Sequence, residues 1–149
     1  MATPPRPRLV IGDAIALARL AWIRETQRRL TAMGYAEFRR SDTAILRRLR
    51  VGPAAFVELA DVVHVSRQAI RKFIEGLDTR GYVSIVRDEG DARRSMVSLT
   101  SSGEKYADAV IDVARALHSE VARVVDSADM ATAVGVLATV TDKWAAGVS

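Results

Sequence analysis

A chain of 149 residues, with 49% hydrophobic residues and a net charge of +4, is long enough for one compact domain with an added helical layer. It has no cysteine, which excludes disulfides, cysteine nucleophiles and cysteine-type zinc sites, and its two histidines are too far apart in sequence to suggest a metal site. No run of 18 apolar residues occurs, and prolines interrupt the first residues, so we expect residues 1–11 to form a disordered tail of a cytoplasmic protein.

Charge is distributed unevenly along the chain. Residues 1–46 carry 8 basic and 4 acidic side chains, and residues 47–94 carry 10 and 7, whereas residues 100–149 carry 4 and 7. A basic first part and an acidic last third indicate an anionic partner on one side of the molecule. A solvated surface with a random asymmetry is the alternative that charge alone leaves open.

The first part of the chain predicts two helices. Apolar spacing favours a helix from about Asp13 to Met33, which Gly34 terminates. Ser41 resembles an N-cap for a second, short helix that ends at Gly52. Pro53 suits the first turn of a third helix, which ends near His64.

The segment SRQAIRKFIEGLDTRG, residues 66–81, predicts a fourth helix capped by Ser66. Its apolar residues recur at three- and four-residue spacing, and its basic residues fall outside that stripe. Because only a tight turn separates it from the third helix, the pair has the pattern of a helix-turn-helix.

Beyond Gly81 the hydrophobic period changes from about 3.6 to 2. Residues 82–87 and 95–99 alternate between apolar and polar side chains, and a charged loop, Asp88 to Arg94, joins them. This pattern predicts a two-stranded β-hairpin.

The last third of the chain predicts two more helices. Thr100 or Ser101 begins a helix that extends to about Val125, and Ser101 and Glu104 have the spacing of a capping box. Ser127 begins a final helix. Both carry apolar stripes with no evident partner within one chain, so we expect them to pack in a homodimer. Packing against the first helix of a monomer is the alternative.

The basic residues of the fourth helix fit the chemistry of DNA recognition. A recognition helix places its N-terminal residues at base edges in the major groove. There glutamine pairs with adenine and arginine with guanine, while lysine and a capping serine suit phosphates. The candidates are Ser66, Arg67, Gln68, Arg71 and Lys72. An ordinary solvated basic face is the alternative.

The hairpin loop resembles a DNA-contacting wing. Arg93 is the candidate for insertion into the minor groove, where negative potential attracts arginine, and Arg94 for a phosphate or strand contact. Asp91 can orient an arginine within the wing, and Gly90 permits a sharp turn. A surface loop with a local ion pair is the alternative.

These motifs together resemble the winged helix-turn-helix of the MarR family of bacterial transcription regulators. The resemblance rests on Leu59-Ala60, SRQAIRKFIEGLDTRGYV (66–83), DARR (91–94) and LTSSG (99–103), each at the spacing of the family pattern. It implies a mainly α fold with a small β-hairpin, in which residues 41–99 bind DNA. Residues 12–40 and 100–149 then serve dimerisation.

Family members are homodimers that bind pseudo-palindromic operators and usually repress transcription. Many release DNA when a small aromatic or phenolic ligand binds between the dimerisation and DNA-binding regions. The candidates for such a cleft here are Trp22, Tyr35, Phe38 and His64, although a core or capping role competes for each.

Two other classes of function compete with DNA binding. A winged helix used only for protein–protein contact would favour an apolar recognition face, whereas this one is basic. An enzyme is not expected, because no acid completes a catalytic triad and no glycine-rich phosphate loop appears; no cofactor is expected either.

Overall fold

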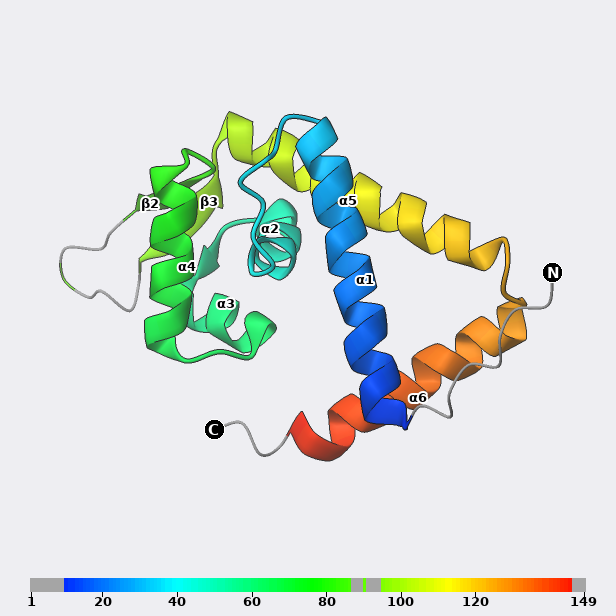
Figure 1. Cartoon of the computed structure of the whole chain (residues 1–149). Helices are drawn as coiled ribbons and strands as arrows, with labels where there is room; N and C mark the ends of the chain where they lie inside the picture. Colours follow the sequence, from blue (N-terminus) through cyan, green and yellow to red (C-terminus); the bar gives the residue numbers. More distant parts are fainter. Residues whose placement is uncertain (1–9, 87–89, 91–94, 146–149) are drawn as a thin grey trace. The chain divides into compact units, whose positions relative to one another are not determined.

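The computed structural model describes residues 10–86, 90 and 95–145. Within these residues, six helices and three short strands follow one another in the order α1, α2, β1, α3, α4, β2, β3, α5, α6. Figure 1 labels the helices and the two hairpin strands. The chain divides into two compact units, residues 1–40 and 41–149. This architecture confirms the mainly α fold class with a small β element. The predicted tail, residues 1–11, lies almost wholly outside the described residues.

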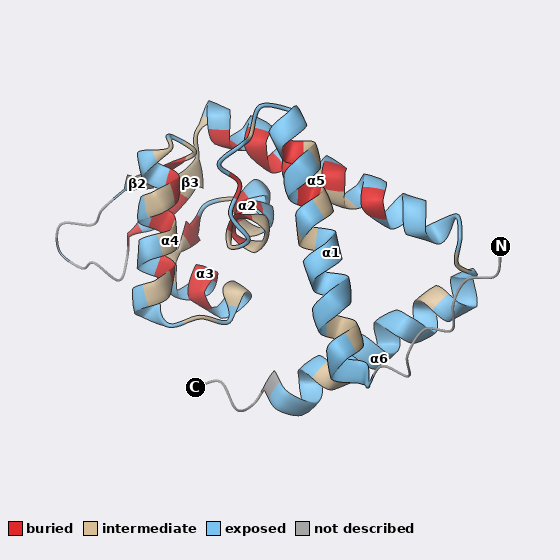
Figure 2. Ribbon diagram, viewed as in Figure 1, coloured by how far each residue is buried: buried red, intermediate tan, exposed pale blue. Residues whose placement is uncertain are grey.

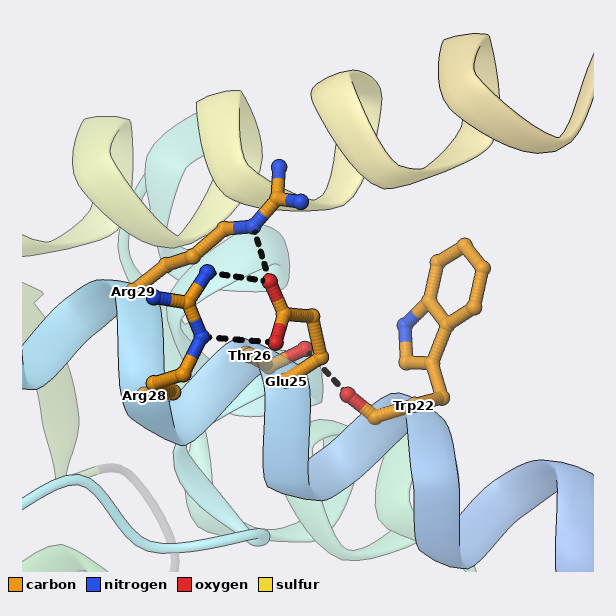
Figure 3. A network of polar contacts seen from close by, with 5 residues as sticks. All are labelled: Trp22, Glu25, Thr26, Arg28 and Arg29. Carbon is orange, nitrogen blue, oxygen red and sulfur yellow. Dashed lines mark hydrogen bonds and ion pairs between the residues drawn. The ribbon is translucent and has the colours of Figure 1, made fainter. Parts of the chain in front are cut away.

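The first unit contains α1, Ile11–Ala32, which starts two residues earlier than predicted. Gly34 follows with a φ of +95°, consistent with the predicted stop. Part of the basic face of α1 is neutralised locally (Figure 3): Glu25 accepts hydrogen bonds from Arg28 and from Arg29. Both arginines therefore contribute less to a free basic surface than their count suggests.

The second unit begins with α2, Asp42–Val51. Ser41 occupies the predicted N-cap position, but it has helical backbone angles and its side chain makes no cap hydrogen bond. The next two helices, α3 (Phe56–Val63) and α4 (Arg67–Thr79), agree with the predicted helix-turn-helix. Their apolar faces are buried (Figure 2), and the core includes Ile45, Leu46, Leu49, Leu59, Ile70, Ile74 and Leu77.

The sheet has one more strand than the sequence predicted. The hairpin strands β2 (Val83–Val86) and β3 (Met96–Leu99) pair antiparallel, with Ile85 opposite Val97. A two-residue strand, β1 (Ala54–Ala55), pairs with the other edge of β3 and gives the order β1-β3-β2. Pro53 was predicted to lie in the first turn of α3, but it precedes the strand β1 instead. Pairing with β3 extends the backbone there.

The helix α5, Ser101–Ala122, starts against the sheet. Its N-cap is Thr100, one of the two predicted starts, whose hydroxyl oxygen accepts from the Gly103 N–H. The predicted Ser101–Glu104 capping box is therefore wrong. Gly103 is buried so close to β2 that a Cβ there would overlap the carbonyl oxygen of Tyr82. The glycine therefore lets the start of α5 lie against the sheet.

The last helix, α6 (Ser127–Ala145), and the end of α5 are mostly exposed (Figure 2). Val121, Val124, Val134, Leu137 and Trp144 all expose large apolar side chains, with Val124 83% exposed. Among the described helices none is long and apolar enough to cross a membrane.

Candidate nucleic-acid interface

The turn between α3 and α4 is defined by backbone geometry. His64 ends α3 in the left-handed conformation, with a φ of 54°, and the Val65 N–H donates back to the Ala60 carbonyl at 3.1 Å. Such a closure satisfies carbonyls at the end of a helix. His64 thus has a role in the turn itself, and its side chain is exposed.

The start of α4 follows as predicted from the sequence. The Ser66 side chain accepts a hydrogen bond from the Ala69 N–H at 3.2 Å. Ile70, Ile74 and Leu77 are buried, which leaves the remaining face of the helix to solvent. The predicted reading residues lie on that exposed face: Ser66, Arg67, Gln68, Arg71 and Lys72.

The first turn of α4 differs in charge from that of every other described helix. The other five carry an acid in the first turn, namely Asp13, Asp42, Glu58, Glu104 and Asp129. An acid there is favourable because the N-terminus of a helix carries partial positive charge. In contrast, α4 has no acid in its first turn and begins with Arg67. This end of α4 therefore combines the helix dipole with a basic side chain.

The basic side chains of α4 also have no ion-pair partners among the residues that the structure describes. Several arginines elsewhere in the second unit are paired: Arg48 with Glu58, Arg50 with Asp108 and Arg80 with Asp42. The Arg50 hydrogen bond lowers the pKa of Asp108. Within the described part of the chain, Arg67, Arg71 and Lys72 form no such pair. Their charges are free to meet an anion.

The predicted wing lies only partly in the described structure. The strands β2 and β3 end with Val86 opposite Met96, and Gly90 in the loop between them is exposed. Asp91, Arg93 and Arg94 fall outside the described residues, so their roles remain predictions.

The four residues predicted to line a ligand cleft have different environments. Trp22 is 40% exposed, Tyr35 is half-buried and Phe38 is buried, and all three belong to the first unit. The Trp22 carbonyl accepts from the Thr26 hydroxyl (Figure 3). His64 belongs to the second unit. A shared cleft therefore stays a prediction.

One buried polar cluster was not predicted from the sequence. The guanidinium of Arg80 donates twice to Asp42, Nη1 to Oδ2 at 2.9 Å and Nη2 to Oδ1 at 3.0 Å. The Tyr106 hydroxyl donates to Asp42 Oδ2 at 2.8 Å. Asp42 lies 38 positions from Arg80 and 64 positions from Tyr106 in the sequence, so no local spacing predicts these contacts.

Comparison with known proteins supports the fold. No family model matches the chain. A segment is 39% identical over 64 residues to the HTH-type transcriptional repressor NicR of Pseudomonas putida, covering 43% of this chain and 40% of that repressor. This chain thus matches less than half the length of that relative.

Solved structures match over most of the chain. BpsR of Bordetella bronchiseptica, whose DNA binding is regulated by 6-hydroxynicotinic acid, gives a TM-score of 0.75 at 18% identity, over 94% of this chain and 99% of that one. A mutant MarR from E. coli in complex with operator DNA gives 0.73 at 21% identity, over 87% and 92%.

Proposed function

We propose that this chain, which has the fold of the MarR-family transcriptional regulators, binds double-stranded DNA as a homodimer and represses transcription. The observation that carries the proposal is the positive charge at the exposed N-terminus of α4, which has no ion-pair partner among the described residues. This charge lies where a recognition helix meets the major groove.

A purely structural role does not account for this charge. Basic residues in a first turn oppose the helix dipole, at a cost of roughly 0.3–1 kcal/mol for each charge. An acid is present at the same place in the other described helices. A bound anion turns the unfavourable arrangement into a favourable one, because phosphate accepts hydrogen bonds from free N–H groups at a helix N-terminus.

The residues divide into base-reading and phosphate-binding groups. Arg67, Gln68 and Arg71 have the side chains that read base edges, whereas Ser66 and Lys72 suit phosphates. In the wing we assign Arg93 to the minor groove and Arg94 to the phosphate backbone of the DNA, with Gly90 and Asp91 shaping the loop.

Exposed apolar side chains on α6 and at the end of α5 support the dimer. A second copy that covers them removes this surface from water, and two-fold symmetry then presents two copies of α4 to successive major grooves. Residues 12–40 and 100–149 are the proposed dimerisation segments, and residues 41–99 the proposed DNA-binding region.

We also propose that a small aromatic ligand regulates DNA binding. The support is the similarity to BpsR, whose DNA binding is regulated by 6-hydroxynicotinic acid. Trp22, Tyr35, Phe38 and His64 remain the candidate contacts.

Selection of genomic fragments by the purified protein tests DNA binding. We expect enrichment of a sequence with two inverted half-sites, centred about 10 base pairs apart. Arg93→Ala should weaken binding to the enriched duplex, whereas Arg115→Ala, an exposed arginine on α5, should not. No enrichment at moderate salt would instead favour a winged helix used for protein contact.

A further inference from the structure

We infer that the buried Asp42–Arg80–Tyr106 cluster is a positioning device that fixes the direction of α4 for operator reading; the inference rests on the proposed DNA binding. The cluster joins three helices. Asp42 begins α2, Arg80 ends α4 and Tyr106 lies in the first half of α5.

Arg80 is attached firmly to α4. It is the C-cap residue, and its Nε donates to the Gly76 carbonyl in the last turn at 2.9 Å. The two remaining nitrogens of the fork donate to Asp42. Because a guanidinium is planar and rigid, a bidentate pair fixes both a distance and an angle. The end of α4 is therefore oriented relative to the start of α2.

Tyr106 extends the same constraint to α5. Its hydroxyl shares Asp42 Oδ2 with Arg80, and its ring lies 4.4 Å from that of Tyr82, which in turn lies 5.6 Å beneath the guanidinium. Burial and the charge of Asp42 raise the pKa of Tyr106 far above its usual range, so the hydroxyl stays a donor. The helix α5 belongs to the proposed dimerisation segment, residues 100–149, so the cluster links that segment to α4.

The free energy of folding alone does not explain why these charged side chains are buried together. The side chains of Asp42 and Arg80 are only 1% and 8% exposed, and removing two charges from water costs free energy that their attraction barely offsets. Apolar residues of similar volume often serve stability as well or better. Directional hydrogen bonds, unlike apolar contacts, specify one orientation.

The position of the cluster magnifies its effect on the reading end. The 13 residues of α4 separate Arg80 from Arg67 by about 20 Å at 1.5 Å per residue. A rotation of about 10° at the cluster therefore displaces the N-terminus of α4 by roughly 3 Å, whereas a functional contact tolerates about 0.5 Å. A small loss of orientation at Arg80 is thus enough to misplace the base contacts.

The main test replaces the ion pair with apolar residues, in the double variant Asp42→Leu/Arg80→Met. A thermal melt first establishes the temperature range over which the variant is folded. Within that range we expect binding to the duplex enriched by the wild-type protein to weaken at least tenfold. Binding to an unrelated duplex at low salt should change less than twofold, because the exposed basic residues are intact.

Two further variants keep the test decisive if the double variant does not fold. Arg80→Lys keeps the charge but loses the fork, and Tyr106→Phe removes only the shared hydroxyl; both should weaken operator binding more than binding to an unrelated duplex. The control is Arg50→Ala/Asp108→Ala, which removes an exposed ion pair between α2 and α5. It should leave both affinities within twofold of wild type.

A measurement without DNA separates this inference from the proposed function. Because the chain has no cysteine, spin labels can be placed at Gln68→Cys on α4 and Ser119→Cys on α5. With excess unlabelled protein, pulsed electron resonance reports the distance within one chain. We expect the distribution to shift or broaden in Asp42→Leu/Arg80→Met and Arg80→Lys but not in the control. An unchanged distribution, or wild-type operator affinity in the folded variants, would overturn the inference.

Discussion

Gln68→Glu should stabilise the free protein and weaken its binding to DNA. The change is isosteric and puts an acid in the first turn of α4, which has none. An acid near the N-terminus of a helix stabilises it by about 0.3–1 kcal/mol. Pairing with Lys72, four residues later, adds roughly 0.2–0.5 kcal/mol, because glutamate precedes lysine. We therefore expect a gain of about 1 kcal/mol, or a rise in Tm of roughly 2–4 °C for a protein of this size.

The same carboxylate should weaken the binding of the protein to DNA. It replaces an amide that can pair with adenine, and a bidentate base contact contributes about 1–3 kcal/mol of discrimination. It also places negative charge beside phosphates. We expect the affinity for the selected duplex to fall at least about tenfold, which corresponds to roughly 1.4 kcal/mol.

The chain offers a matched control for this substitution. Gln27→Glu makes the identical change at an exposed position in the interior of α1, away from the helix ends. It should alter Tm and operator affinity far less. Thermal melts and fluorescence anisotropy titrations of the three proteins measure both quantities. If Gln68→Glu gains no stability, or binds the duplex as tightly as Gln27→Glu, the charge reasoning for α4 is wrong.

Three further predictions concern stability. Ser66→Ala removes the side-chain cap of α4 and should lower the free energy of unfolding in urea by about 1 kcal/mol, whereas Ser41→Ala, at a position without a cap bond, should change it far less. Gly103→Ala forces a methyl group against the Tyr82 carbonyl and should cost roughly 1–3 kcal/mol or more; a fully stable variant would contradict the close approach of α5 and β2. Hydrogen bonds from Arg28 and Arg29 lower the pKa of Glu25 from 4.5 to about 2. Its contribution to stability is therefore complete above pH 4.5 and disappears as the pH falls toward 2, so Glu25→Gln should flatten the pH dependence of Tm in that window; an unchanged slope would contradict the pairing.

Local signals in the sequence predict α4 and its cap well. The apolar residues of α4 follow the helical period, and Ser66 is the hydroxyl residue directly before them, so the exposed basic face follows from spacing alone. Where hydroxyl residues are adjacent, local signals are ambiguous. Thr100 is the actual cap of α5, and its hydroxyl also donates to the Gly81 carbonyl at 2.6 Å, a contact that only the tertiary fold creates.

Long-range contacts account for what the sequence did not predict. The strand β1 consists of two alanines, which have no strand preference, and it forms only because β3 pairs with it. Whether an arginine is free or paired depends on distant carboxylates, as with Arg50 and Asp108, 58 positions apart. The basic surface of α4 could therefore be predicted in outline, but its contrast with the paired arginines required the structure.

The salt dependence of binding to the selected duplex tests the central claim most directly. The comparison is between wild type, Arg67→Ala/Arg71→Ala and the control Lys105→Ala/Arg115→Ala, which removes the same charge from the exposed face of α5. If α4 binds the duplex, the first variant binds more weakly, and its slope of log K against log salt becomes shallower by about 0.9 for each phosphate that the protein no longer neutralises. The control should keep the wild-type slope. Identical slopes and affinities for all three proteins would contradict the assignment of α4 as the DNA-binding helix.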